Sequence, residues 1–161
     1  MNDIARPHKY GIKRAADGLP HFASVDDLLA HMQPHLPVYC LFPERFAAAA
    51  ERFKDFPGDV LYAVKANPHP VALTNLWNGG IRHFDSASLG EIEAVKSLFP
   101  DAICHFMAPV RLPDQAKAAF EKHGVTDFVV DSDAELDKLL AEIGEPKKIR
   151  IFVRLVAQLG G

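Results

Sequence analysis

The sequence predicts an α/β fold in which helices pack on a parallel β-sheet. From about residue 59 onward, short apolar runs rich in β-branched and aromatic residues alternate with segments of helical periodicity, in units of roughly 20 to 25 residues. Several of the helical segments carry their own start or stop residues. Because 48% of the 161 residues are hydrophobic, the chain can also bury a core.

The amino-terminal part, residues 1–36, is expected to be a polar leader with one short helix, followed by a sheet-containing domain over residues 37–161. Ser24 can cap the helix, which has apolar residues at helical spacing and ends at Pro34. A strand is expected over residues 38–42. Pro43 then opens a second helix with Phe46, Ala50 and Phe53 on one face.

One lysine stands at the end of the apolar run over residues 60–64. If the strand alternation continues to this lysine, Lys65 shares a face with Leu61 and Ala63. The turn at residues 67–68 follows at once, because a residue that precedes proline avoids the helical region. Lys65 is therefore either a strand-end lysine in water or a desolvated amine suited to forming a Schiff base.

The remaining elements follow from periodicity and capping signals. Ser88 with Glu91, and Ser132 with Glu135, have capping-box spacing, and Gly144 can end the last helix. The expected elements, in order, are a helix over 69–78, a strand over 81–85, a helix from 88, a strand near 102–107, a helix over 113–122, a strand over 128–131, a helix from 132 and a strand over 149–155.

Two architectures have this alternation, an open doubly wound sheet and a (β/α)8 barrel. No Gly-x-Gly-x-x-Gly follows any expected strand, which counts against a dinucleotide-binding sheet. A complete barrel needs about 250 residues. The sequence therefore predicts an incomplete barrel, with about five of its eight strands.

Composition excludes several classes of function. The formal net charge is −3 and neither sign is gathered in a long run, so neither nucleic acid nor a membrane surface is an expected partner. Without a signal peptide or a membrane span, a cytoplasmic location is the default expectation. Cys40 and Cys104 stand in apolar runs and are expected to be buried free thiols, and no spaced His or Cys pair predicts a metal site.

Three charged residues occupy the carboxyl ends of expected strands: Lys65, Asp85 and Arg154. In a barrel these ends form the face that carries the active site. Two cations and an anion around one opening could orient one another and hold an anionic ligand, the alternative being charges at solvated strand ends.

Four segments resemble a known family. They are residues 62–68 (YAVKANP), 84–92 (FDSASLGEI), 130–132 (VDS) and 150–154 (RIFVR). They are similar to the ornithine/diaminopimelate/arginine decarboxylases, which are pyridoxal-phosphate enzymes on an alanine-racemase-like barrel. The resemblance runs from about residue 38 to residue 155.

The resemblance implies roles for four residues. Lys65 matches the lysine that holds pyridoxal 5′-phosphate as a Schiff base, Asp85 the aspartate beside it, and Arg154 the arginine that interacts with that aspartate near the cofactor. Glu91 matches a glutamate near the site, although helix capping explains it equally well. His105, Met107 and Arg111 lie where the family differs, and no role is assigned to them.

The implied activity is decarboxylation of a small basic amino acid, with ornithine to putrescine, in polyamine biosynthesis, as the first choice. Lysine, diaminopimelate and carboxynorspermidine decarboxylases are the alternatives, together with a non-catalytic, decarboxylase-like regulatory binding protein. The 161-residue chain is expected to be the amino-terminal portion of a homodimeric enzyme and to be inactive alone. It would lack the phosphate-binding loop and the carboxyl-terminal β-domain.

Overall fold

A computed structural model describes residues 18–144 and 148–156 of the chain. The chain divides into two compact units, residues 1–42 and 43–161, which are described separately. Within the first unit lies helix α1 (Val25–Met32), whose N-cap Ser24 accepts a hydrogen bond from the Asp27 backbone N–H, as expected from the sequence.

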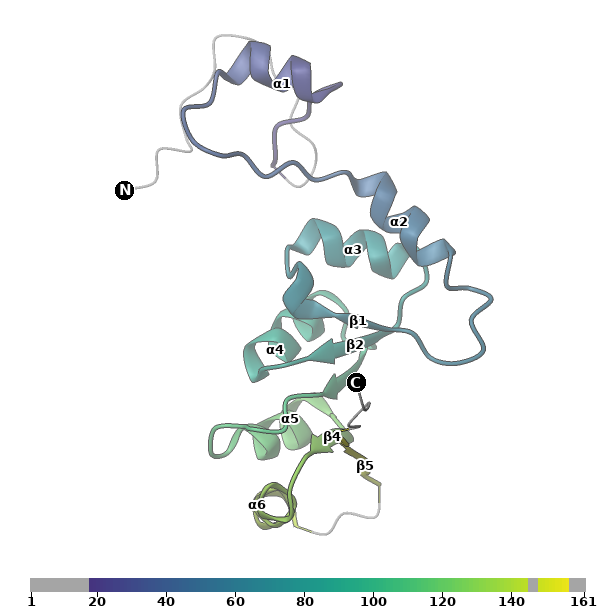
Figure 1. Ribbon diagram of the computed structural model, residues 1–161, viewed down its shortest axis with the longest axis vertical. Coiled ribbons are helices and arrows are strands. Elements are labelled where there is room, and N and C mark those ends of the chain that lie inside the picture. The colour runs from purple at the N-terminus through teal and green to yellow at the C-terminus, as the bar shows by residue number, and fades with distance from the viewer. Residues whose placement is uncertain (1–17, 145–147, 157–161) are drawn as a thin grey trace, which may run out of the picture. The chain divides into compact units, whose positions relative to one another are not determined.

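The second unit contains one sheet of five parallel strands (Figure 1). Its order is β1-β2-β3-β4-β5, so each strand lies beside the strand that precedes it in the chain. The strands are β1 (Leu61–Ala63), β2 (His83–Ser86), β3 (Ile103–Phe106), β4 (Asp127–Val130) and β5 (Arg150–Val153).

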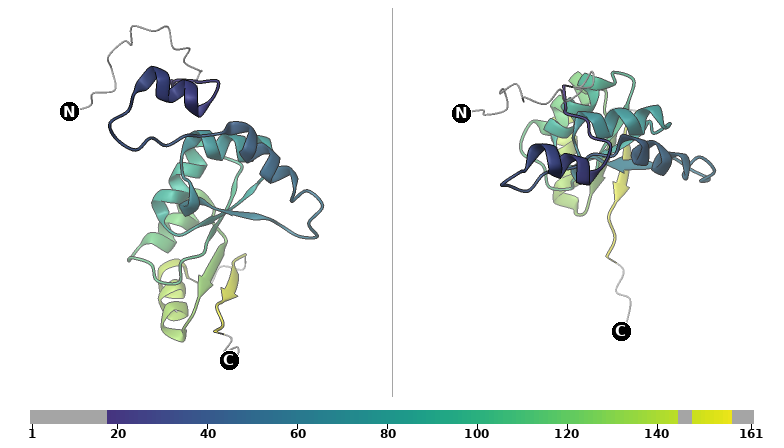
Figure 2. Two further views of the ribbon diagram at one scale, coloured as in Figure 1. Left: turned by 45° about the horizontal axis from the view of Figure 1, so that its top comes forward. Right: turned by 90° about the horizontal axis from the view of Figure 1, so that it is seen from above.

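The connections between the strands carry helices that gather on one side of the sheet (Figure 2). Helix α2 precedes β1, and a single 3-10 turn, η2, follows it. The helices and the turn of this unit are α2 (Pro43–Glu51), η2 (Val64–Ala66), α3 (Pro70–Asn78), α4 (Leu89–Leu98), α5 (Gln115–His123) and α6 (Asp133–Ile143).

The core lies between the sheet and these helices. Phe84, Phe106 and Phe128 occupy β2, β3 and β4 and are fully buried, and they belong to one cluster with helix residues such as Ile92 and Leu139. Because side chains alternate along a strand, the residues directly before and after each of these phenylalanines face the other side of the sheet. That second face carries the polar residues described below.

The expected capping signals are confirmed at two helices. Ser88 accepts a hydrogen bond from the Glu91 N–H at the start of α4, and Ser132 accepts one from the Glu135 N–H at the start of α6. Gly144 follows α6 with φ +74°, a left-handed value that a glycine adopts without strain. Pro146, which lies two residues further along and could also end this helix, is outside the described residues.

Three expectations in and near residues 38–53 are wrong. Residues 38–42 form no strand, and Tyr39 is 94% exposed. A strand needs a neighbour to satisfy its backbone groups, and the described residues offer none to this run. Cys40 is consequently exposed, whereas Cys104 is a buried free thiol as expected. Helix α2 ends at Glu51, so Phe53 lies beyond it and is half exposed.

The strand order decides between the two architectures. A doubly wound sheet reverses its strand order and carries helices on both faces, whereas a (β/α)8 barrel adds each strand beside the last. The sequential order with helices on one side is therefore that of a partial barrel with five strands.

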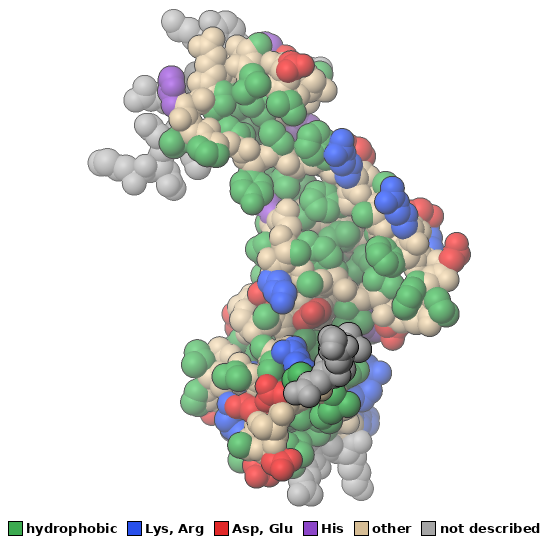
Figure 3. All heavy atoms as spheres, viewed as in Figure 1, with side chains coloured by type: hydrophobic (Ala, Val, Ile, Leu, Met, Phe, Trp, Pro, Cys, Tyr) green, Lys and Arg blue, Asp and Glu red, His purple; other side chains and the backbone are tan. Residues whose placement is uncertain are grey.

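Figure 3 shows hydrophobic side chains reaching the surface between the charged groups.

Candidate functional site

Lys65 lies in the η2 turn, two residues beyond the end of β1. The chain leaves the strand early because the following turn is fixed locally. Asn67 is extended before Pro68, and its side-chain oxygen accepts a hydrogen bond from the His69 N–H. Lys65 therefore does not share a strand face with Ala63, and its side chain is exposed. Of the two alternatives for Lys65, the structure shows the lysine in water and not the desolvated amine.

Asp85 and Arg154 lie at the same edge of the sheet as Lys65. Asp85 is a half-buried residue of β2 whose Cα pairs with Ala63 of β1, and Arg154 directly follows β5. The strands are parallel, so their carboxyl ends meet at one edge. Among the described residues no ion pair joins any two of Lys65, Asp85 and Arg154. The Arg154 guanidinium instead donates to the Met107 carbonyl at 3.2 Å.

Glu91 has a structural role that the geometry explains. Its carboxylate oxygen Oε2 accepts a hydrogen bond from the Ala87 N–H at 2.8 Å, while its own N–H donates to Ser88 Oγ at 3.2 Å. Both contacts lie at the start of α4, where backbone N–H groups have no partner within the helix. Glu91 therefore closes the amino terminus of α4.

These residues fit pyridoxal phosphate by the chemistry of their groups. An aldehyde needs a primary amine within reach, and Lys65 Nζ takes part in no hydrogen bond or ion pair within residues 18–144 and 148–156. Asp85 and Arg154 supply one charge of each sign at the same edge of the sheet. Lys65 is therefore the residue that could hold the cofactor, with Asp85 and Arg154 as its charged neighbours.

A polar row crosses the other face of the sheet from β2 to β5. His83 Nδ1 lies 2.9 Å from His105 Nε2, and His105 Nδ1 lies 2.6 Å from Asp127 Oδ2. Asp127 then accepts two hydrogen bonds from Arg150, at 2.7 Å from Nε and 2.6 Å from a terminal nitrogen. Four strands thus contribute one member each to what we call the cross-sheet row: His83, His105, Asp127 and Arg150.

The cross-sheet row passes directly beside Asp85. In the register of the sheet, Asp85 pairs with His105, His105 with Asp127, and Asp127 with Arg150. Register partners in a parallel sheet point to the same face. Asp85 therefore belongs to the same line of side chains as His105, Asp127 and Arg150. Because successive strands are staggered, this line runs from near the carboxyl end of β2 to the amino end of β5.

Burial governs the electrostatics of the row. His105 is 3% exposed, and the loss of water lowers its pKa below the ordinary value, although the nearby Asp127 carboxylate acts in the opposite direction.

Cys104, which does not belong to the row, is affected by burial as well, because burial raises the pKa of its thiol to about 11. Cys104 is therefore protonated at neutral pH and unsuited to act as a nucleophile.

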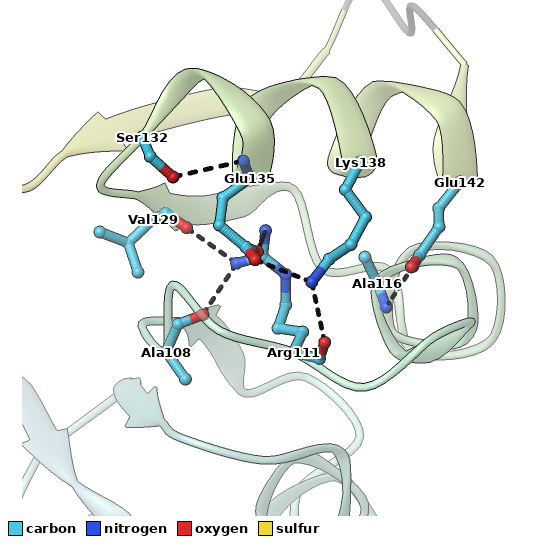
Figure 4. A network of polar contacts seen from close by, with 8 residues as sticks. All are labelled: Ala108, Arg111, Ala116, Val129, Ser132, Glu135, Lys138 and Glu142. Carbon is cyan, nitrogen blue, oxygen red and sulfur yellow. Dashed lines mark hydrogen bonds and ion pairs between the residues drawn. The ribbon is translucent and has the colours of Figure 1, made fainter.

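Arg111 anchors the loop that joins β3 to α5 (Figure 4). One guanidinium nitrogen donates to the carbonyls of Ala108 and Val129, both at 2.8 Å, and so ties the loop to β4. Lys138 on α6 donates to the Arg111 carbonyl and pairs with Glu135, each at 2.9 Å. The loop whose Met107 carbonyl receives Arg154 is thus held from two sides.

Sequence reasoning missed both of these networks. One signal for the cross-sheet row was available, the alternation of side chains along a strand. His83 and Asp85 are two residues apart, so both face away from the helices. The pairing between strands was not available from local patterns. In the described part of the chain, no group of three or more His, Cys, Asp or Glu could hold a metal ion, and no helix is long and apolar enough to cross a membrane.

Comparison with protein families gives a match over most of the chain. The family model for the pyridoxal-dependent decarboxylases, pyridoxal binding domain, matches residues 41–159, well over half of the chain. The matched region includes Lys65, Asp85, Glu91 and Arg154. No curated protein matches the chain.

Several solved structures are similar. Ornithine decarboxylase from Entamoeba histolytica is 31% identical with a TM-score of 0.58, over 69% of this chain and 33% of that one. Lysine/ornithine decarboxylase from Vibrio vulnificus, complexed with cadaverine, is 25% identical with a TM-score of 0.66, over 92% and 39%. The arginine decarboxylase of Paramecium bursaria Chlorella virus, bound to agmatine, is 24% identical with a TM-score of 0.69, over 81% and 35%, and shows the fold alone. The chain thus spans about a third of the length of these relatives.

Proposed function

Because the chain belongs to the pyridoxal-dependent decarboxylase family, we propose that it supplies the cofactor-binding lysine of an amino-acid decarboxylase, with Lys65 as that residue. The observation that carries the proposal is the position of Lys65 at the carboxyl edge of the sheet, exposed and without a partner among the described residues. A primary amine without an ion pair would be available to hold the cofactor through its aldehyde group.

The other residues of the edge have supporting parts in this proposal. Pyridoxal phosphate, when bound, supplies an electron sink for the electron pair left by departing CO2. Asp85 and Arg154 would set the charge around the ring, and the Met107 carbonyl would hold the Arg154 guanidinium in place. Glu91 would have an indirect part, because it holds the amino terminus of α4 in place through the Ala87 N–H.

A small basic amino acid is the proposed substrate class, with ornithine first. Support comes from the ornithine and the lysine/ornithine decarboxylases among the similar structures. Lysine, diaminopimelate and carboxynorspermidine remain alternatives, as does a non-catalytic, decarboxylase-like regulatory binding protein. A homodimer and a cytoplasmic location stay predictions.

The test is borohydride reduction of the chain mixed with pyridoxal phosphate, followed by peptide mass mapping. Borohydride makes the bond between the cofactor and its lysine permanent, so the proposal predicts a modified Lys65. Lys65→Ala should lose the labelling. Lys117→Ala, which removes an exposed lysine of α5, is the matched control and should keep it. Labelling spread over surface lysines, unchanged in Lys65→Ala, would contradict the assignment.

A further inference from the structure

Strand β5 lacks the usual determinant of strand register. Register is strongly specified where one face of a strand is buried and the other is not, because a slip of one residue exchanges the two faces. In β5 the two faces differ little, since Ile151 is 38% exposed and Phe152 is 42% exposed. The apolar pattern of β5 alone therefore chooses weakly between registers.

The Asp127–Arg150 ion pair supplies a strong determinant at this strand. Asp127 is 1% exposed, and both of its carboxylate oxygens accept hydrogen bonds from the Arg150 fork. His105 Nδ1, on the strand at the other side of β4, lies 2.6 Å from Oδ2 of the same carboxylate. In a register shifted by one residue, Arg150 would point to the helix-covered face, and the buried Asp127 carboxylate would lose its cation and both hydrogen bonds from the fork, which is strongly unfavourable.

The face of Arg154 depends on this register. Arg150 and Arg154 are four residues apart, so both lie on the same face of an extended chain. A slip of one residue would turn Arg154 away from the face that carries Asp85. We infer that the Asp127–Arg150 ion pair fixes the register of β5 and thereby positions Arg154 at the carboxyl edge of the sheet.

The inference concerns a positioning role and has two separable parts. The register of β5 is independent of any activity, whereas the use of Arg154 beside a cofactor rests on the proposed function. One competing determinant is present, because Ile149, just before β5, packs against the core. The experiment therefore removes the ion pair and leaves Ile149 in place.

Amide hydrogen exchange reads the register directly. The Arg150 N–H donates to the Thr126 carbonyl at 2.8 Å and the Arg154 N–H to the Val130 carbonyl at 2.9 Å. Parallel pairing directs every second amide to the neighbouring strand. In the observed register the protected amides of β5 are those of even-numbered residues, and a slip of one residue would transfer protection to Ile151 and Val153.

The main variant is Asp127→Asn/Arg150→Leu in the full 161-residue chain. It removes both charges, while the asparagine oxygen still faces His105. We expect the amides of β3 and β4 to stay protected, and protection in β5 to spread to Ile151 and Val153, or these residues to give two sets of signals. Asp59→Asn is the matched control, because Asp59 lies 3.4 Å from His83 at the other end of the row. It should leave the even-numbered pattern unchanged.

Three outcomes would overturn the inference. The first is an unchanged single pattern in the double variant, which would mean that Ile149 sets the register. The second is loss of protection throughout β5, which would mean that the ion pair holds β5 on the sheet without selecting its register. The third is protection of Ile151 and Val153 in Asp59→Asn as well. If the double variant does not fold, Arg150→Met decides. It removes both the charge and the fork from a side chain that is 62% exposed, so Ile151 and Val153 should gain protection. An unchanged pattern there would also overturn the inference.

Titration of the same proteins with pyridoxal phosphate separates the two parts. If Arg154 acts beside the cofactor, the double variant should lose affinity by the same factor as Arg154→Met. Affinity that is unchanged when the register is lost would overturn the role of Arg154 and leave the register result standing. A wild-type chain that binds no cofactor would contradict the proposed function and leave the exchange result intact.

Discussion

His83 Nδ1 and His105 Nε2 lie 2.9 Å apart on neighbouring strands, so the two rings share one hydrogen between them. The second nitrogen of His105 faces the buried Asp127 carboxylate, and the second nitrogen of His83 lies 3.4 Å from Asp59. Each imidazole therefore has a neighbour at both nitrogens. A change in the protonation of either ring must alter a contact of the row.

The fold should lose stability in mild acid because of His105. Burial lowers its pKa in the folded chain below the value of about 6.5 that it has when unfolded. Below that value the unfolded chain binds the proton more tightly, so the stabilisation present above about pH 6.5 is lost as the pH falls. Urea unfolding at roughly pH 7.5 and pH 5.5 should show a lower midpoint in acid.

His105→Gln should flatten this pH dependence, because the titrating group is gone. His35→Gln provides the control, since His35 is an exposed residue of the first unit and its loss should leave the dependence intact. An acid-induced fall of equal size in His105→Gln would mean that another group is responsible.

Glu91→Ala should cost about 1 kcal/mol of stability, which is typical for the loss of a helix cap. The expected cause is the unpaired Ala87 N–H at the start of α4. Glu91→Gln should cost less, because its amide oxygen can still accept that hydrogen bond. Urea unfolding measures both, with the exposed Glu93→Gln as reference. A large loss of cofactor affinity in Glu91→Gln, without a loss of stability, would show that Glu91 also acts in the site.

Gly79→Ala should destabilise the chain by about 1–3 kcal/mol, the usual cost of overpacking. A Cβ atom at residue 79 would lie 2.7 Å from the Ala50 Cβ, where α2 meets the end of α3. Gly90→Ala is the opposite case, because the nearest atom to its added Cβ is 4.0 Å away, and it should be neutral or stabilising by up to about 1 kcal/mol. Thermal unfolding of both variants checks the contrast, and equal effects would contradict it.

Arg111→Met should destabilise the chain by about 3 kcal/mol, because the buried Val129 carbonyl and the partly buried Ala108 carbonyl lose their donor. Arg111→Lys should recover only part of this, since an ammonium does not reproduce the planar guanidinium between the two carbonyls. Lys117→Met on the exposed face of α5 serves as the reference in urea unfolding. Full recovery by lysine would show that the charge matters and the geometry does not.

Local sequence signals predicted most of the fold. The caps at Ser88 and Ser132 act over three residues, so their spacing alone was sufficient. The five strands of the sheet were found because each is a short apolar run between helices. The strand expected over residues 38–42 failed for the opposite reason, since a strand depends on a neighbour that its own sequence does not specify.

The candidate site was predictable in position but not in its contacts. Lys65, Asp85 and Arg154 do lie at one edge of the sheet, because parallel strands bring their carboxyl ends together. The 3-10 turn at Lys65 depends on the proline turn that follows it, and the cross-sheet row depends on the stagger between neighbouring strands. Neither is visible in the periodicity of a single segment.

The sequential strand order also has a consequence during synthesis on the ribosome. Each strand of the sheet pairs with the strand made just before it, so a newly emerged βα unit already has its neighbour. Folding of this part can therefore proceed by addition at one growing edge, without waiting for distant segments. A ribosome that pauses between two units would hold a nascent chain whose earlier strands are already paired.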